Sequence, residues 1–174
     1  VDSSEIINTL AGGGVSTVGY ATQEIEQEQK GLLSRFRNDD DEEIDTANRI
    51  TSLVRMATKA RLTLECNIGE TERALVLVSG PPKYLSRKGI ERGRKWLEEQ
   101  TGSMEVRGGD YPVGESSKVA SVVLLSGVTN VPRIKELQGK AVEAQDNIEE
   151  IRSESEAALE ELVEDDQDEL EPLF

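Results

Sequence analysis

The chain has 174 residues, of which 36% are apolar and 3% aromatic, and 35 acidic against 20 basic residues give it a formal net charge of −15. This excess of carboxylates argues against a nucleic-acid-binding face and against an anionic membrane surface, because few cations are available to neutralise phosphates. Histidine is absent and Cys66 is the single cysteine, which excludes Cys–His catalysis, most zinc sites and an internal disulfide. A reducing cytoplasmic location fits this cysteine usage, and no apolar stretch is long enough to predict a transmembrane segment.

The acidic residues are spread along the whole chain, and two explanations for them stay open. The protein is either an ordinary acidic protein with a charged tail, or one adapted to high intracellular salt, where charges are screened over about 3 Å at 1 M. The sequence opens at Val1 inside a hydrophobic and acidic stretch, so we expect a fragment of a longer protein.

The first predicted element is a helix over residues 3–10, with Ser3 or Ser4 as its N-cap. Its apolar stripe at helical spacing consists of Ile6, Ile7 and Leu10. Three glycines at 12–14 end this helix, and the β-branched run at 15–22 predicts a strand. The glycines do not suggest a phosphate-binding loop, because such a loop follows a strand and precedes a helix, and here the order is reversed.

Residues 23–45 are polar and charged and are predicted to form a long mobile connection. The acidic run at 38–43 within it lacks the glycine and the bidentate glutamate of a calcium loop, so we interpret it as solvated. Apolar residues at helical spacing predict a helix over 46–59, and residues 60–68 are expected to contain a short strand.

Two unalternated apolar runs, at 73–79 and 119–126, predict strands that are covered on both faces. Between them, Ser86 is a plausible cap for a helix ending near residue 100, in which two glycines allow close approach to a sheet, and residues 104–106 form a short strand. This helix carries the basic cluster, which is either a protein contact or a solvent-facing side, and which consists of Arg87, Lys88, Arg92, Arg94 and Lys95.

A long helix is predicted from Pro132 to about residue 165, followed by an acidic tail at 166–174. A 3-4 apolar spacing runs through Ile134, Leu137, Ala141, Ala144, Ile148, Ile151, Ser155, Ala158 and Leu162. This seam fits either a coiled coil or a helix lying on its own domain. The predicted fold class is therefore α+β: a small mixed four-stranded sheet with two packed helices, then a long C-terminal helix.

The opening VDSSEIINTLAGGGVSTVGYAT resembles the segment that joins the two domains of tubulin and FtsZ, in which a V-D-x-x-[DE] loop begins a helix. The stretches RALVLVSGPPKYLSRKGIERGRKWLEEQTGSMEVRGGDYP and VASVVLLSGVTNVPRIKELQ are similar to the archaeal CetZ group of this superfamily. The similarity runs over about residues 1 to 140. CetZ proteins occur largely in halophilic archaea, which agrees with the acid excess.

This resemblance implies a cytoskeletal GTPase that assembles head to tail into protofilaments and controls cell shape. It implies that Asp2 and Glu5 are catalytic in trans: they form the acidic loop that activates hydrolysis of the GTP bound by the neighbouring subunit. GTP and Mg would be bound mainly by an N-terminal domain whose glycine-rich signature is missing here. Residues 1–14 would then hold the acidic loop and connecting helix, and residues 15–131 the activating domain.

By itself this chain is expected neither to bind GTP tightly nor to hydrolyse it, and no metal ligands are predicted within it. The acidic tail, which ends in LEPLF, is a candidate segment for recruiting a partner protein. The alternative function is that of a non-enzymatic adaptor that dimerises through the helix at 134–162. A complete small-molecule enzyme is disfavoured, because no histidine and no nucleophile–base pair are found.

Overall fold

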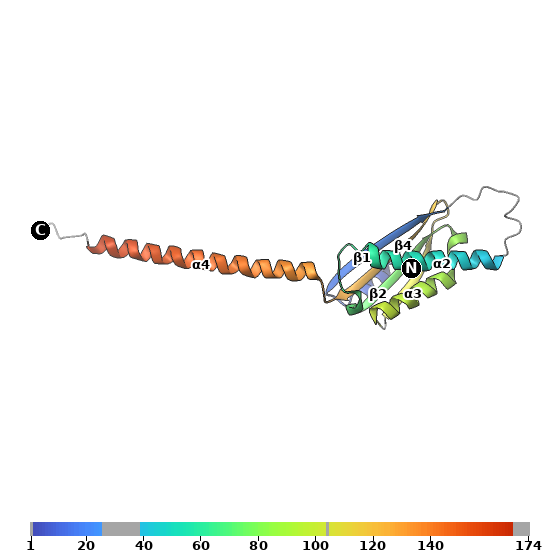
Figure 1. The fold of residues 1–174 in the computed structure, drawn as a ribbon, viewed down its shortest axis with the longest axis horizontal. Helices are drawn as coiled ribbons and strands as arrows, with labels where there is room; N and C mark the ends of the chain where they lie inside the picture. The colour runs from blue at the N-terminus through green and yellow to red at the C-terminus, as the bar shows by residue number, and fades with distance from the viewer. Residues whose placement is uncertain (1, 26–38, 104, 169–174) are drawn as a thin grey trace. The chain divides into compact units, whose positions relative to one another are not determined.

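The computed structural model describes residues 2–25, 39–103 and 105–168, and it divides into two units between Val131 and Pro132. Each unit is described by itself. The described part of the first unit contains a four-stranded sheet, three helices and two short 3-10 turns (Figure 1). In chain order its elements are α1 (Ser3–Leu10), β1 (Val15–Glu24), α2 (Asp39–Ala60), η2 (Ile68–Glu70), β2 (Arg73–Gly80), η3 (Pro82–Tyr84), α3 (Arg87–Thr101), β3 (Glu105–Pro112) and β4 (Lys118–Val128).

The sheet has the strand order β1-β4-β2-β3 and is mixed. Strand β4 pairs antiparallel with both β1 and β2, so that Leu124 lies between Val18 and Leu75. Strand β3 pairs parallel with β2, which requires the crossover that α3 provides. The predicted α+β fold class, with a small mixed four-stranded sheet, is therefore confirmed.

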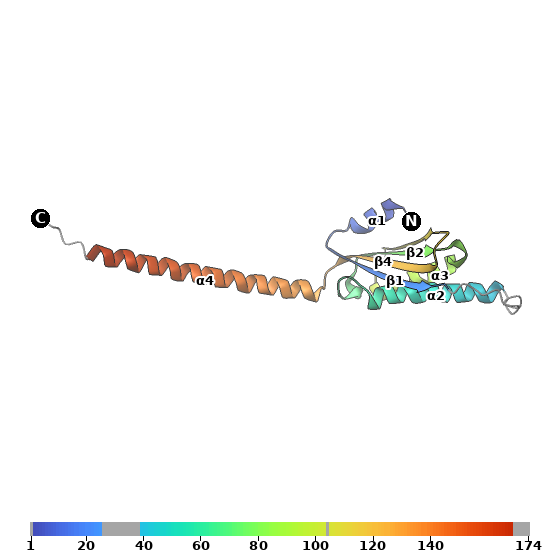
Figure 2. The same ribbon diagram turned by 90° about the horizontal axis from the view of Figure 1, so that it is seen from above.

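Helices α2 and α3 pack on one face of the sheet, and α1 contacts β2 and β4 from the opposite face (Figure 2). The core lies between the sheet and the α2–α3 layer. Its largest fully buried side chains include Ile50, Leu53, Leu97, Leu125, Val76 and Val123. Because the central strands β2 and β4 are covered on both faces over much of their length, their sequences are continuously apolar.

Two glycines of α3 permit a close approach, but to a different neighbour from the one predicted. A Cβ at Gly89 would lie 2.8 Å from the Ala47 Cα, and one at Gly93 would lie 2.8 Å from the Val54 Cγ2. Both neighbours belong to α2, so the glycines bring α3 against a helix rather than against the sheet.

Several predicted boundaries were wrong. Helix α2 begins at Asp39, seven residues before the predicted start at 46, and the acidic stretch from Asp39 onward is helical rather than a loop. The rest of the predicted mobile connection, at 26–38, lies outside the described residues. Strand β3 continues to Pro112, whereas the prediction ended it at residue 106.

The short strand predicted within residues 60–68 is not present, although the structure describes all of these residues. Instead, this segment runs along the edge of β1. The Thr63 N–H donates to the Val18 carbonyl at 2.8 Å, and the Val18 N–H donates to the Thr63 hydroxyl at 3.1 Å. An isolated bridge joins Gly19 to Leu62, and a Cβ at Gly19 would clash with the Ala57 carbonyl. The segment therefore occupies backbone groups of an otherwise open sheet edge.

The second unit consists of the helix α4 (Pro132–Asp168), as the sequence predicts. Pro132 opens it, at a position where the missing N–H costs nothing. At 1.5 Å per residue a helix of 37 residues is about 55 Å long. Every residue from Lys135 to Leu162 is exposed.

Candidate functional site

The structure places Asp2 at the N-cap of α1, a position that the sequence analysis had given to Ser3 or Ser4. The Asp2 carboxylate accepts hydrogen bonds from the Ser4 N–H at 2.8 Å, from the Glu5 N–H at 3.2 Å and from the Ser4 hydroxyl. These bonds satisfy amide groups that the first helical turn leaves without partners. The Ser4 hydroxyl, followed by the two N–H groups, lowers the pKa of Asp2 below its ordinary value.

Glu5 lies in the first turn of α1, and its carboxylate has no partner among the described residues. Among the residues that the structure describes, none donates a hydrogen bond to this carboxylate or forms an ion pair with it. Glu5 occupies the third helical position, where in a capping box its side chain would reach back to the N–H of the cap. Because that bond is not made, the negative charge of Glu5 is available to an incoming group.

Helix α1 is fixed to the sheet by contacts near its C-terminal end. The Arg73 guanidinium donates to the Asn8 carbonyl at 2.8 Å and forms an ion pair with Glu105 at 3.0 Å, so it connects α1 to β2 and β3. Thr9 is buried, and its hydroxyl donates to the Glu5 carbonyl at 2.8 Å. Sequence reasoning missed Arg73, since 65 residues separate it from its partner in α1 and no local pattern links them.

A glycine turn behind α1 carries the chain back into the sheet. Gly13 and Gly14 adopt positive φ angles of 74° and 71°, which glycine reaches without the strain of a Cβ. The predicted role of these residues as a helix stop and turn is confirmed. Neither glycine lies next to a helix N-terminus that could bind phosphate, since α1 ends there and β1 follows.

The apolar stripe of α1 does not face the core of the first unit. Ile6, Ile7 and Leu10 are 41%, 64% and 42% exposed, and Thr9 is the buried residue of this helix. The uncovered face continues onto the sheet, where Val18 and Tyr20 of β1 are 38% and 50% exposed. These two side chains alternate with Thr17, Gly19 and Ala21, which are buried toward α2, and so they point to the α1 side.

The basic cluster of α3 separates into side chains with different surroundings. Arg94 contacts Glu91 at 3.0 Å and Glu98 at 3.5 Å, and also donates to the Val106 carbonyl. Arg92 and Lys95 line an open pocket of about 580 Å³ together with Arg55 and Trp96. The Arg55 guanidinium lies 5.4 Å from the Trp96 ring centroid and stabilises this face by a cation–π contact that the sequence analysis did not predict.

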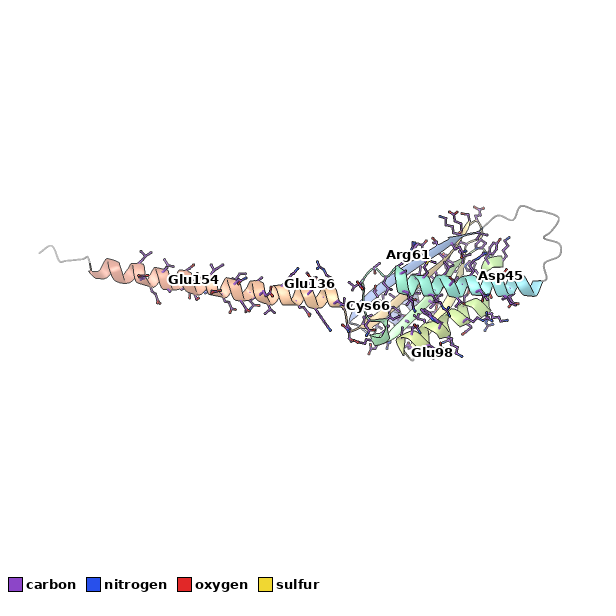
Figure 3. The ribbon with its side chains drawn as sticks, in the orientation of Figure 1. Asp45, Arg61, Cys66, Glu98, Glu136 and Glu154 are labelled. Carbon is purple, nitrogen blue, oxygen red and sulfur yellow. The ribbon has the colours of Figure 1, made fainter. Side chains whose placement is uncertain are left out.

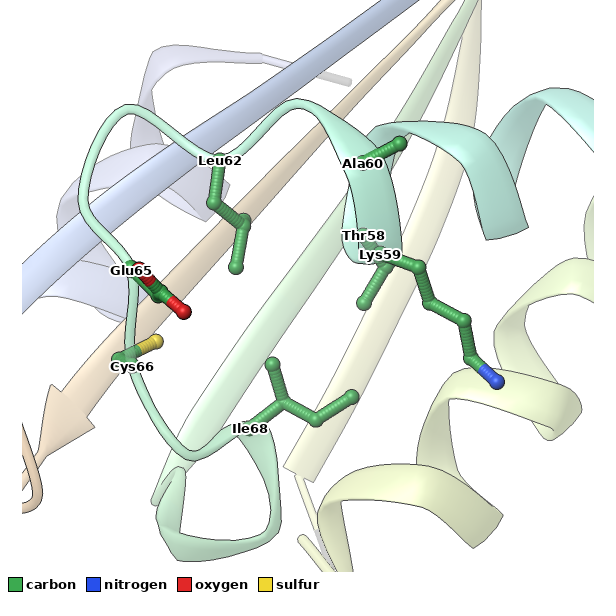
Figure 4. Close-up of a pocket in the computed structure, with 7 residues that line it drawn as sticks. All are labelled: Thr58, Lys59, Ala60, Leu62, Glu65, Cys66 and Ile68. Atoms are coloured by element: carbon green, nitrogen blue, oxygen red, sulfur yellow. The ribbon is translucent and has the colours of Figure 1, made fainter.

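A second pocket, of about 530 Å³, lies where α2 ends and the chain turns towards η2 (Figure 4). Leu62 and Ile68 point into it, whereas the Lys59 amine points towards α3 and lies 5.5 Å from the Trp96 ring centroid. Burial raises the pKa of the Cys66 thiol, so the thiol stays protonated at neutral pH and is a poor nucleophile. Nothing in this pocket suggests catalysis.

Within residues 2–25, 39–103 and 105–168, no three His, Cys, Asp or Glu side chains gather closely enough to hold a metal ion. In the same described part of the chain, no helix is both long and apolar enough to cross a bilayer.

Comparisons with known proteins place these features in a family. A family model described as "Tubulin-like CetZ, C-terminal domain" matches residues 1–143. The chain is 69% identical over 160 residues to the tubulin-like protein CetZ1 of Haloferax volcanii, covering 87% of this chain and 40% of that protein. It is 56% identical to CetZ3 of the same organism, covering all of this chain and 45% of that protein. The chain therefore spans less than half the length of these relatives.

Two solved structures from Haloferax volcanii share the fold at appreciable identity. A GDP-bound monomer of CetZ1 superposes with a TM-score of 0.71 at 64% identity, over 83% of this chain and 39% of the other. A GTPγS-bound protofilament of CetZ2 gives a TM-score of 0.70 at 39% identity, over 86% of this chain and 40% of the other. The chain belongs to the tubulin-like CetZ proteins, and its first 143 residues match their C-terminal domain.

Proposed function

We propose that this chain is the activating domain of a CetZ-type GTPase, and that its acidic loop completes the active site of the next subunit in a filament. The observation that carries the proposal is the free carboxylate of Glu5, held at the start of α1 by the Asp2 cap. Phosphoryl transfer to water requires a group that orients the attacking water, and a carboxylate within hydrogen-bond reach can do this.

The two acidic residues would have different parts in this site. The Asp2 carboxylate accepts hydrogen bonds from amides of the first turn and so sets where α1 begins. Glu5 keeps its carboxylate free to accept a proton or a hydrogen bond from water. We therefore assign the water-orienting role to Glu5 and a positioning role to Asp2.

The nucleotide would be bound mainly by a part of the protein outside this chain. CetZ1 and CetZ2, which are about twice as long as this chain or more, have been solved with GDP and with GTPγS, and the CetZ2 structure is a protofilament. By this kinship we propose that the parent protein binds GTP with Mg, assembles head to tail, and acts in the cytoplasm in cell-shape control.

The uncovered apolar face supports a larger parent protein. Ile7 and Tyr20 expose 64% and 50% of their surface on the α1 side of the sheet. Contiguous exposed apolar surface commonly marks an interface. We propose that the remainder of the parent protein covers this face and holds α1 at the junction of the two domains.

The test is the substitution Glu5→Gln in the full-length protein, with GTP turnover and pelletable polymer recorded on the same samples. Glutamine keeps the size of the side chain and removes its charge. We expect turnover to fall at least about tenfold, which corresponds to about 1.4 kcal/mol on the barrier, while polymer persists or accumulates.

Two further variants control this experiment. Glu115→Gln removes an equally simple charge from an exposed turn between β3 and β4, and it should leave turnover unchanged. Glu5→Asp keeps the charge on a shorter side chain and should retain more activity than Glu5→Gln. Unchanged turnover and polymer in Glu5→Gln would show that the opening of the chain is only a capped helix start.

A further inference from the structure

We propose that α4 pairs with α4 of a second copy of this chain as an antiparallel coiled coil centred near Asp146. The starting observation is an apolar seam that no other part of the second unit covers within its described residues. Leu137, Ile148, Ile151 and Leu162 are 50%, 65%, 63% and 66% exposed along this helix. Figure 3 shows α4 with its side chains, with Glu136 and Glu154 labelled. An isolated helix gains little from such a seam in water, and helices of this kind are normally stabilised by packing.

The spacing of the seam is that of a coiled coil. Its positions alternate by three and four residues from Ile134 to Leu162, which keeps one stripe facing a partner helix. The large and small residues occur in pairs along this stripe: Ile134 and Leu137, then Ala141 and Ala144, then Ile148 and Ile151, then Ser155 and Ala158. The order of these pairs discriminates between the two possible orientations of the partner.

A parallel, in-register pair would stack like on like. Ala141 and Ala144 would face their own copies in a thin layer next to the thicker layer of Ile148 and Ile151, so no single separation of the helices would pack both layers well. An antiparallel pair instead sets each large residue from Ile134 to Ile151 against a small one, and leaves Leu162, the last seam residue, outside the paired layers. Its core layers are Ile134 with Ala158, Leu137 with Ser155, Ala141 with Ile151, and Ala144 with Ile148, each layer occurring twice by symmetry.

The flanking charges favour the same orientation and the same register. In this antiparallel register Lys140 faces Glu154 of the second copy, and Arg133 faces its Glu161. In the single chain both cations share one carboxylate, that of Glu136, at 2.7 and 2.6 Å. Among the described residues, neither Glu154 nor Glu161 has an ion pair or a side-chain hydrogen bond.

The overall charge distribution along α4 points the same way. Residues 132–140 carry three basic side chains and one acidic, whereas residues 149–162 carry six glutamates and one arginine. A parallel pair would place the two acidic segments side by side, which costs free energy. The antiparallel pair places each acidic segment next to a basic one. The seam and its flanking charges are thus complementary to a second, antiparallel copy of α4.

This pairing would connect two copies through their C-terminal helices, separately from any head-to-tail contact. It does not depend on the proposed GTPase role, since it rests on α4 alone. The seam also lies largely beyond residue 143, where the match to the family model ends.

The first test measures the mass of the 174-residue chain by sedimentation equilibrium over a concentration series, at low and at high potassium chloride. We expect a twofold mass at the higher concentrations. Ile148→Asp places a charge in the seam and should return the mass to that of the monomer. Val142→Asp is its matched control, because Val142 is 59% exposed but lies off the seam.

The second test determines orientation by disulfide formation in a Cys66→Ser background. Ala141→Cys and Ile151→Cys chains are oxidised separately and as an equimolar mixture. The antiparallel register brings residue 141 against residue 151 of the partner, so only the mixture should cross-link. Each cysteine would lie about 15 Å along the helix from its own copy, too far for a disulfide.

The outcomes separate cleanly. A dimer that is lost in Ile148→Asp, kept in Val142→Asp and cross-linked only in the mixture supports the proposal. Cross-linking of each cysteine chain with itself would show a parallel pair and overturn it. A monomer at all concentrations, or a dimer insensitive to Ile148→Asp, would overturn it as well.

Discussion

At the scale of single residues, the Asp2 cap makes the start of α1 sensitive to acid. The pKa of the Asp2 carboxyl is lowered in the folded chain, because its ionised form accepts the hydrogen bonds of the first helical turn. The stabilisation is therefore complete above the ordinary pKa of an aspartate and is lost as pH falls through the lowered value. We expect the Ser4 amide resonance to titrate with this lowered pKa in an NMR series, as its hydrogen bond to Asp2 is lost.

Asp2→Asn is the matched control for this titration, because asparagine also caps helices but does not ionise. In that variant the acid transition of the Ser4 amide should vanish while α1 stays formed. Asp2→Ala should fray α1 at every pH. A Ser4 titration that survives in Asp2→Asn would show that another group is responsible.

The local structure around the candidate site residues could be predicted from sequence only in part. The spacing of Asp2 and Glu5 at a helix start, together with the family resemblance, was enough to choose them. That Asp2 caps the helix was not visible, because serines at positions 3 and 4 were equally good candidates for the cap. The choice among them depends on the extended backbone of Asp2, with φ −109° and ψ 175°, and a sequence pattern does not record that angle.

At the scale of elements, two helical glycines should respond in opposite ways to substitution by alanine. Gly139 in α4 has nothing within 4 Å of an added Cβ, whereas Gly89 in α3 faces the α2 backbone. Gly139→Ala should stabilise α4 by about 1 kcal/mol and raise the helical signal in circular dichroism. Gly89→Ala should destabilise the first unit by about 1–3 kcal/mol, because the two helices must separate.

Thermal and urea unfolding of the two variants would measure both effects side by side. A Gly89→Ala chain as stable as the wild type would show that the α2–α3 contact is looser than described. A Gly139→Ala chain with no added helicity would show that α4 is already fully formed at this point.

Strong sequence patterns predicted the helices and strands well. Weak patterns failed where tertiary contacts determine the local structure. The apolar runs of β2 and β4 and the Ser86 cap of α3 were placed correctly, because burial on both faces and capping leave clear traces in sequence. Residues 60–68 were misjudged as a strand, because the pairing of Thr63 with β1 uses a hydroxyl as well as the backbone. The early start of α2 was hidden by its acidic first residues, which resemble a loop in composition.

At the scale of the whole molecule, substitutions on the exposed apolar face should affect the stability of this chain less than that of the full-length parent protein. Ile7 is 64% exposed here, so Ile7→Ser should change the free energy of unfolding of this chain by less than about 0.5 kcal/mol. If the rest of the parent protein covers this face, the same substitution should destabilise the full-length protein clearly more. Thermal unfolding of both proteins checks this, and equal small effects would contradict the proposed cover.

The segment from Leu62 to Leu64 affects whether copies of this chain can aggregate through the edge of the sheet. An open edge strand can template further strands and so lead to aggregation. Along β1, the Val18 amide and carbonyl already bond to Thr63, and the Leu64 N–H donates to the Thr17 hydroxyl at 3.1 Å. Copies that meet through this side of the sheet cannot add strands at these positions without first displacing the segment. When many copies are crowded together, the segment therefore opposes aggregation by strand addition at these positions of β1.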